Sequence, residues 1–216
     1  MKHPRNGRRL AVCLLAFLVT TCQSESSTVI LVHGFLDTSR KMQSMAAYLR
    51  TQGWTAYTPA LTPSNGSEGL ERMAGKLEAY INEKCGPDRR IDLVGFSMGG
   101  IVSRYYVQRL GGNRRVAHLV TIASPNHGTL MGYFSGSKAA REMRPGSPFL
   151  KALNADLHTL DRLKFTSLWT PLDLMIIPAS SSRMPVGKEV RIWMPAHPLM
   201  VWNSGCHRAV AAALRE

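Results

Sequence analysis

The sequence has little acid, little cysteine and no long apolar run. Its 216 residues include 14 Asp and Glu against 27 Lys and Arg, for a formal net charge of +13 at pH 7, and four cysteines. No stretch approaches the ~20 apolar residues of a membrane-spanning helix, and we find no internal repeat or low-complexity segment. With 44% hydrophobic and 19% charged residues, the chain can bury a substantial core. This composition excludes a disordered or polytopic membrane protein and indicates one globular domain.

The excess of basic residues is spread along the chain. No four basic residues are adjacent, and no aromatic residues are interleaved with the basic pairs. We therefore expect no nucleic-acid partner, because single-strand binders combine a basic groove with stacking aromatics. A solvated basic surface is the simpler interpretation, and peripheral contact with an anionic membrane surface is the alternative. We expect no metal or cofactor, since there is no Cys/His cluster at metal-ligand spacing, no G-x-G-x-x-G and no P-loop.

Residues 1–22 resemble a signal peptide. Four basic residues precede the apolar run Leu10–Val19, and no acid occurs among them. Ten apolar residues are too few to span a membrane, so export is favoured over a permanent anchor. Loss of this segment would lower the formal charge from +13 to +9. The remaining residues, 23–216, are expected to form a single α/β domain.

Two routes of export stay open. The segment Leu18-Val-Thr-Thr-Cys22 resembles a bacterial lipobox, in which the cysteine is lipidated, although Thr21 stands where a smaller residue is usual. Ordinary cleavage between residues 21 and 26 is the alternative. The protein is accordingly expected to be periplasmic, secreted or lipid-anchored at Cys22. In an exported protein the two remaining cysteines, Cys85 and Cys206, are candidates for one disulfide if their Cα atoms come within about 7 Å.

Apolar patterning predicts alternating strands and helices. Runs of β-branched and apolar residues, bounded by glycine and proline, alternate with segments in which apolar residues recur at helical spacing. This alternation predicts a mostly parallel central sheet with helices on both faces. The expected strands are 27–32, 54–57, 91–94, 116–122, 165–169 and 190–194, and the expected helices are 39–52, 70–81, 98–110, a stretch within 149–160, and 209–214.

The motif Gly95-Phe-Ser97-Met-Gly99 directly follows an expected strand and opens an expected helix. G-x-S-x-G is a weak pattern alone, but this context is the one a nucleophile elbow requires. The turn must be tight enough to project the serine hydroxyl from the sheet, and the flanking glycines avoid a clash there. The helix N-terminus would offer free N–H groups to a developing oxyanion. An ordinary glycine-rich turn is the structural alternative.

With these residues the sequence resembles the α/β-hydrolase superfamily, and within it the small bacterial lipases and esterases. The resemblance also rests on His33-Gly-Phe35 after the first strand and on the segment Ala123–Thr129 after the fourth, and it covers nearly the whole chain after residue 22. It implies an oxyanion hole formed by the backbone N–H groups of Phe35 and Met98. The spacing of the strands predicts little or no cap, since only about 40 residues separate the expected fourth and fifth strands and part of these must form a crossover helix.

The resemblance further implies a Ser-His-Asp triad in the chain order serine, acid, histidine. Asp173 follows an expected strand, in a segment that looks like the family's acid-bearing one, and His197 lies 24 residues later in a loop before the closing helix. Ser97, Asp173 and His197 are therefore the predicted catalytic residues, and His207 is the competing base. The competing acids are Glu142, Asp156, Asp161, Glu189 and Glu216.

Such a triad would make the protein a carboxylic ester hydrolase, an esterase or lipase, acting on a small-molecule ester or lipid. Thioesterases and amidases share this machinery, and a non-catalytic binding protein on the same scaffold is the alternative class. Some apolar residues near the strand ends could line an acyl pocket or belong to the core. These are Leu36, Met131, Met194 and Leu199, together with Met98, Tyr133, Phe134 and Met200.

Overall fold

The computed structural model of the protein describes residues 27–216. The expected signal peptide at residues 1–22, and with it lipidation of Cys22, falls outside the described residues. No helix within residues 27–216 is both long enough and apolar enough to cross a membrane.

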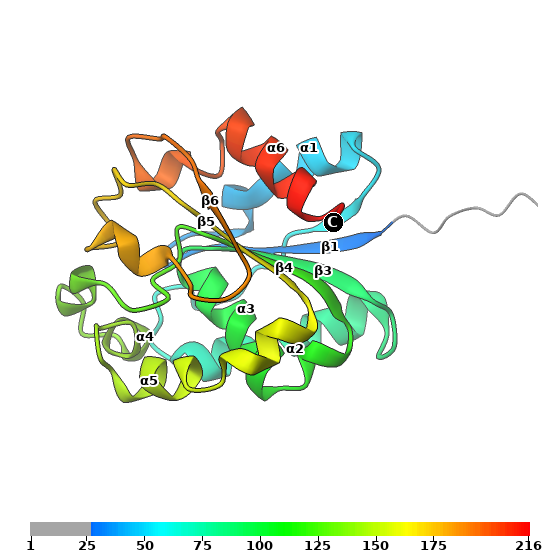
Figure 1. The fold of residues 1–216 in the computed structure, drawn as a ribbon. Coiled ribbons are helices and arrows are strands. Elements are labelled where there is room, and N and C mark those ends of the chain that lie inside the picture. The colour runs from blue at the N-terminus through cyan, green and yellow to red at the C-terminus, as the bar shows by residue number, and fades with distance from the viewer. Residues whose placement is uncertain (1–26) are drawn as a thin grey trace, which may run out of the picture.

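Six strands form the central sheet, in the spatial order β2-β1-β3-β4-β5-β6 (Figure 1). Every neighbouring pair is parallel, which confirms the predicted α/β class. β1 and β3 are buried along their whole length, as the continuous apolar run of β1 predicts for a strand covered on both faces. The strands are β1 (Thr28–Val32), β2 (Thr55–Tyr57), β3 (Ile91–Phe96), β4 (Val116–Ile122), β5 (Lys164–Trp169) and β6 (Lys188–Arg191).

Helices cover both faces of the sheet, and each face has its own apolar core (Figure 1). On one face lie α1 (Gln43–Thr51) and α6 (Ser204–Ala213). The other face carries α2 (Leu70–Cys85), α3 (Met98–Arg109), α4 (Lys138–Glu142) and α5 (Pro148–Asn154).

A distant carboxylate caps the first turn of α2. Glu142 Oε2 accepts a hydrogen bond of 2.7 Å from the Leu70 N–H, one of the amides that a helix N-terminus leaves without an intrahelical partner. Partial burial raises the pKa of Glu142, while the Leu70 bond opposes that shift. Glu142, one of the competing acids, thus has a structural role between α4 and α2.

The segment of residues 128–160 packs mainly on the helices beneath it. Its α4 contacts α2, its α5 contacts α3, and the Ala139 N–H donates to the Gly66 carbonyl at 2.9 Å. Both short helices therefore belong to the layer that covers one face of the sheet (Figure 1). This arrangement agrees with the expected minimal cap.

The last strand differs from its prediction. It spans Lys188–Arg191 rather than residues 190–194. As an edge strand it has one neighbour, β5, and Trp169, the last residue of β5, pairs with Arg191. The Ile192 N–H still donates to the Trp169 carbonyl at 2.8 Å, but residues 193 and 194 have no neighbouring strand along which to extend. The final helix begins at Ser204, five residues before its predicted start, because Asn203 Oδ1 caps it by accepting from the Cys206 N–H at 2.8 Å.

The structure contradicts the candidate disulfide between Cys85 and Cys206. Cys85 ends α2 and packs against the core on that face of the sheet, whereas Cys206 is buried in the core around α1 and α6. The sheet separates the two thiols, and both are free. Burial raises the pKa of Cys206 to about 12 and also raises the pKa of the half-buried Cys85, although nearby Arg115 opposes that shift.

We predict that the two thiols react at very different rates. Cys85 should be alkylated slowly in the native protein, because it is partly exposed with a raised pKa, and Cys206 only after unfolding. Peptide mapping of iodoacetamide-treated protein, native against denatured, measures both. A Cys85–Cys206 cross-linked peptide in a non-reducing digest would contradict the structure.

Candidate active site

Ser97 occupies a strained turn between β3 and α3. Its backbone has φ 53° and ψ −124°, a conformation that costs free energy for a residue with a Cβ atom. Two hydrogen bonds hold the turn: the Ser97 N–H donates to the Ile122 carbonyl at 2.8 Å, and the Gly100 N–H donates to the Ser97 carbonyl at 3.0 Å. The serine is partly exposed although the residues on either side of it are buried, so the turn presents its hydroxyl group to solvent.

The glycines of this motif lie where a side chain has no room. A Cβ atom on Gly95 would lie 2.5 Å from Gly100 Cα. One on Gly99 would lie 2.5 Å from the carbonyl oxygens of both Val32 and His33. These contacts are with backbone atoms, which cannot rotate away. Gly99 therefore lets the start of α3 pack directly on the end of β1.

Asp173 and His197 form a buried hydrogen-bonded pair. His197 Nδ1 lies 2.8 Å from Asp173 Oδ2, and both side chains are buried. The other carboxylate oxygen accepts from the N–H groups of Met175 at 2.8 Å and Ile176 at 2.9 Å. The carboxylate is thus fixed in orientation, and a proton on Nδ1 leaves Nε2 of the imidazole able to accept another.

The imidazole of His197 lies beside the Ser97 turn. Its ring centroid is 4.8 Å from that of Phe96, the residue before Ser97. The structure therefore brings the Asp173–His197 pair, which comes from the loops after β5 and β6, to the end of β3. Only the parallel arrangement of the strands makes these three loops meet, because it places their carboxyl ends at one edge.

The loop after β1 lies against the same turn. A Cβ atom on Gly34 would lie 3.1 Å from Ser97 Cβ. In the described part of the chain, neither the Phe35 N–H nor the Met98 N–H donates to a backbone carbonyl, so both amides are available at this edge. The buried His33 ring fixes this loop. Its Nδ1 donates to the Gly34 carbonyl at 3.0 Å, and its Nε2 accepts from the Leu61 N–H at 3.1 Å.

The competing histidine has a different environment. His207 is buried in α6, where its ring stacks on Tyr48 at 5.4 Å and Nε2 donates to the Val201 carbonyl at 2.8 Å. A second acid–histidine pair, between the buried Asp92 and the partly buried His118 at 2.7 Å, lies near the amino ends of β3 and β4. Neither histidine contacts Asp173.

Several competing acids are engaged elsewhere. Asp156 pairs with Arg109 and accepts from the Thr159 hydroxyl. Glu189 pairs with Arg183 at 2.7 Å and accepts from the indole of Trp169 at 2.9 Å. Hydrogen bonds from these partners lower the pKa of Glu189, with Arg183 the largest cause.

Exposed apolar side chains surround the edge at which Ser97 lies, and we call them the apolar rim. Within residues 27–216, all the large hydrophobic residues that are exposed follow β1, β4, β5 or β6 in the chain. Parallel strands put these loops at one edge, so the residues gather there. The rim consists of Leu36, Leu130, Tyr133, Phe134, Leu172, Leu174, Met175, Trp193, Leu199 and Trp202.

The predicted pocket residues divide into two groups. Leu36 and Leu199 belong to the rim, and Met131 and Met194 are half-buried beside it. The side chains of Met98 and Met200, by contrast, are fully buried in the two cores. Sequence reasoning missed six residues of the rim: Leu130, Leu172, Leu174, Met175, Trp193 and Trp202. Leu172, Leu174 and Met175 lie just after an expected strand, which could have indicated them, whereas Trp193 lies within the expected strand 190–194.

Cations lie against three aromatic residues of the rim. Lys41 Nζ is 4.3 Å from the ring of Trp202, and the guanidinium groups of Arg144 and Arg191 are 4.6 Å and 5.3 Å from Tyr133 and Trp193. The sequence alone does not single out these cations, because Lys41 and Arg144 are distant in the chain from Trp202 and Tyr133, and Arg191 lies only two residues from Trp193. The rim therefore combines apolar area with positive charge.

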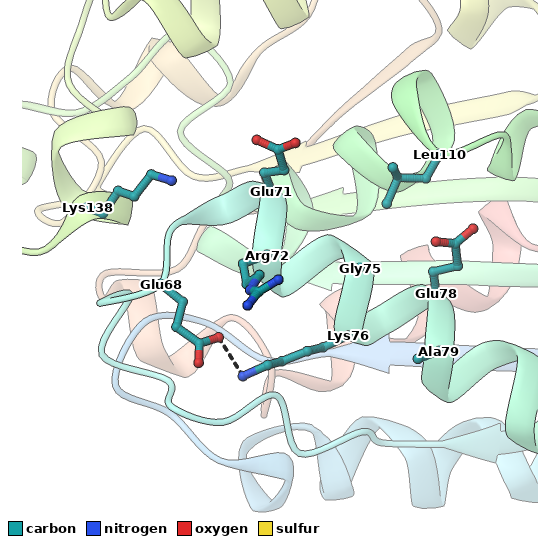
Figure 2. A pocket seen from close by; sticks show the side chains of 9 residues that line it. All are labelled: Glu68, Glu71, Arg72, Gly75, Lys76, Glu78, Ala79, Leu110 and Lys138. Atoms are coloured by element: carbon teal, nitrogen blue, oxygen red, sulfur yellow. Dashed lines mark ion pairs between the residues drawn. The ribbon is translucent and has the colours of Figure 1, made fainter.

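A cavity of about 700 Å³ lies elsewhere, along α2 (Figure 2). Its lining mixes three glutamates with three basic side chains, and the ion pair of Glu68 with Lys76 at 2.5 Å crosses one end. None of Ser97, Asp173 and His197 lines it. We assign it no part in the candidate site.

Solved structures that match the chain define its fold as the α/β-hydrolase fold. Mature lipase BlEst2 of Bacillus licheniformis aligns with a TM-score of 0.70 and 17% identity, over 88% of this chain and 91% of that one. Lipase B of Aspergillus fumigatus aligns with a TM-score of 0.75 and 14% identity, over 90% and 54% of the two chains. An extracellular α/β-hydrolase from a Paenibacillus species gives 0.60 and 17%, over 87% and 97%. At such identities the likeness shows the fold alone.

The sequence pattern of the class 2 lipases matches residues 83–210, which is more than half of the chain. The protein belongs to this lipase family, and the resemblance to small lipases and esterases is confirmed. The pattern of the palmitoyl protein thioesterases matches residues 28–134. Residues 83–134, which contain Ser97, fit both patterns.

We predict that Gly99→Ala destabilises the protein by about 1 to 3 kcal/mol, the usual cost of forcing extra volume into a packed site. Gly75→Ala is the matched control: it lies inside α2, and a Cβ atom there meets nothing within 4 Å. That change should stabilise by about 0.5 to 1 kcal/mol through helix propensity. Urea unfolding of the two variants measures both values, and equal free energies of unfolding would contradict the close packing of α3 on β1.

Proposed function

We propose that the protein is a serine hydrolase that cleaves carboxylic esters through an acyl-enzyme on Ser97. The observation that carries the proposal is the buried 2.8 Å Asp173–His197 hydrogen bond beside the strained turn that presents Ser97. A serine hydroxyl alone is a weak nucleophile and needs a base that is itself oriented by a third group. Membership of the class 2 lipase family supports the same reaction type.

In the proposed first half-reaction, Ser97 Oγ attacks the ester carbonyl carbon while His197 Nε2 takes its proton. The N–H groups of Phe35 and Met98 stabilise the oxyanion of the tetrahedral intermediate. When that intermediate collapses, the bond to the alcohol oxygen breaks, and His197 gives its proton to the leaving alcohol.

The second half-reaction repeats these steps with water as the nucleophile. His197 removes a proton from the water, and the carboxylic acid leaves as Ser97 regains its own proton. The Met175 and Ile176 N–H groups hold the Asp173 carboxylate in place by donating to Oδ1. This carboxylate stabilises the imidazolium that forms in each half.

The apolar rim supports a lipid or other apolar ester as the substrate. Exposed apolar area around a polar reaction centre suits an acyl chain and costs little to desolvate. Because α4 and α5 pack against α2 and α3, we propose an open site that hydrolyses soluble short- to medium-chain esters, with weaker action on long chains. The cations against Tyr133, Trp193 and Trp202 suit peripheral contact with an anionic membrane surface.

A thioester substrate is the second candidate. The match of residues 28–134 to the palmitoyl protein thioesterase pattern favours it, and the same triad could cleave either bond. Comparing kcat/KM for matched octanoyl esters and octanoyl thioesters decides between the two.

The proposed location is outside the cytoplasm, whether periplasmic, secreted or anchored at Cys22.

We predict that Ser97→Ala and His197→Ala each lower kcat about 10⁴-fold or more on p-nitrophenyl butyrate, and that Asp173→Asn lowers it by about 10⁴, because triad members act as a unit. The matched control is Asp92→Asn, which disrupts the Asp92–His118 pair and should leave kcat within about threefold of wild type at temperatures where both proteins are folded. Retained turnover in folded Ser97→Ala protein would contradict the assignment of Ser97 as the nucleophile. That result would point to another nucleophile, whereas absence of turnover in folded wild-type protein would favour a non-catalytic binding protein.

We also predict that the rate rises smoothly as tributyrin concentration crosses its solubility limit, since no segment needs to open. A pH-stat titration with dissolved and emulsified substrate at equal enzyme concentration measures this. A sharp increase confined to the emulsion would show that residues 128–160 move, and it would overturn the open-site proposal.

A further inference from the structure

Arg104 is a fully buried arginine on α3, two turns after Ser97. Its three hydrogen bonds all go to neutral amides: Nε to Gln108 Oε1 at 3.2 Å, Nη1 to Asn126 Oδ1 at 3.2 Å and Nη2 to Asn154 Oδ1 at 2.8 Å. Burial, together with the charge of Arg109, lowers the pKa of Arg104 to about 9. A buried cation without a carboxylate partner costs folding free energy, whereas an apolar residue would fill the same core without that cost.

Two of these amides fix the loop after β4. Asn126 accepts from Arg104 through its side-chain oxygen, while its Nδ2 donates to the Ser182 carbonyl at 2.8 Å. Asn154, which also accepts from Arg104, donates to the Asn126 carbonyl at 2.9 Å. The fixed fork of the guanidinium can hold both asparagines at once, so Asn126 is held at both its main chain and its side chain.

The loop that Arg104 holds also holds the segment that begins at Asp173. The Thr129 hydroxyl donates to the Met175 carbonyl at 2.7 Å and accepts from the Ile177 N–H at 3.0 Å. The Leu130 N–H donates to the Ile177 carbonyl at 2.9 Å. Met175 in turn donates its N–H to Asp173 Oδ1. With the Asn126–Ser182 bond, residues 126–130 therefore hold residues 175–182 near both ends.

We propose that Arg104 is a positioning residue for the Asp173–His197 pair. Through Asn126 it fixes residues 126–130, and these hold residues 175–182 near both ends. The backbone of residues 175 and 176 in turn orients the Asp173 carboxylate. Arg104 contacts neither substrate nor the reacting atoms. The proposal rests on the proposed function, because the orientation of Asp173 matters for turnover only if His197 is the base.

The test compares Arg104→Gln and Arg104→Lys with Arg109→Gln as the matched control. Arg109 lies on the same helix and also holds α5, through the Ala152 carbonyl and Asp156, but it has no bond to Asn126. Lysine keeps the charge of Arg104 without the fork that reaches two asparagines at once. All three variants are measured for Tm, for kcat and KM on p-nitrophenyl butyrate, and for the downfield proton NMR signal of the His197 Nδ1–H, assigned by its loss in Asp173→Asn.

Both Arg104 variants should lower kcat about 10- to 100-fold with KM changed less than threefold, as expected for a misplaced catalytic group. They should also broaden or shift the His197 proton signal, while Arg109→Gln keeps both the signal and kcat. If the folded Arg104 variants lose Tm alone, with wild-type kcat and an unchanged signal, Arg104 is merely structural and the proposal is wrong. The signal does not depend on turnover, so failure of the proposed function would be recognised separately by an active Ser97→Ala protein.

A further variant, Asn126→Asp, tests the proposal even if the Arg104 variants do not fold. It gives Arg104 a carboxylate partner but removes the N–H donor to the Ser182 carbonyl, so Tm should fall less than in Arg104→Gln while kcat still falls about tenfold or more. Wild-type kcat in folded Asn126→Asp protein would overturn the proposal, since the route from Arg104 to residues 175–182 would then be without consequence.

Discussion

The backbone turn at Ser97 is the constraint on which the candidate site depends. A serine with positive φ is unfavourable in isolation, and it persists here because the surrounding atoms allow no other arrangement. β4 accepts the Ser97 N–H through the Ile122 carbonyl, and the close approach of Gly99 to the end of β1 fixes where α3 begins. Contacts with the central strands of the sheet thus stabilise the strained turn. The turn in return places a partly exposed hydroxyl group at the N-terminus of a helix.

The parallel sheet supplies the rest of the site. Because all six strands run the same way, the loops after β1, β3, β5 and β6 converge, and four segments distant in sequence contribute Phe35, Ser97, Asp173 and His197. The same geometry collects the apolar rim at that edge and leaves the opposite edge to pairs such as Asp92–His118. One architectural feature therefore accounts for both the proposed chemistry and the surface that would receive its substrate.

Much of the fold and of the candidate site was predictable from the sequence, since both depend on local apolar patterns and short motifs. β4 coincides with its predicted span, α3 ends one residue before its predicted end, and the proximity of Asp173 to His197 follows from their positions after parallel strands. The roles of these side chains in catalysis stay predictions. The disulfide could not be judged, because sequence does not reveal on which face of the sheet α2 and α6 pack.

The proposed role of Arg104 was equally hidden, since an arginine side chain is normally solvated and its partners Asn126 and Asn154 lie 22 and 50 residues away. The end of β6 was misjudged for a similar reason. An edge strand stops where its only neighbour stops, and that limit is set by β5 rather than by the apolar residues that follow Arg191.

The most direct measurement of the central claim is covalent capture of the nucleophile. Wild-type protein would be treated with a fluorophosphonate, digested, and mapped by tandem mass spectrometry, with crystals of the adduct examined in parallel. The account predicts one phosphonyl group per chain, on Ser97 Oγ, with its phosphoryl oxygen within hydrogen-bond distance of the Phe35 and Met98 N–H groups. Absence of modification in folded protein, or modification of a residue other than Ser97, would contradict it.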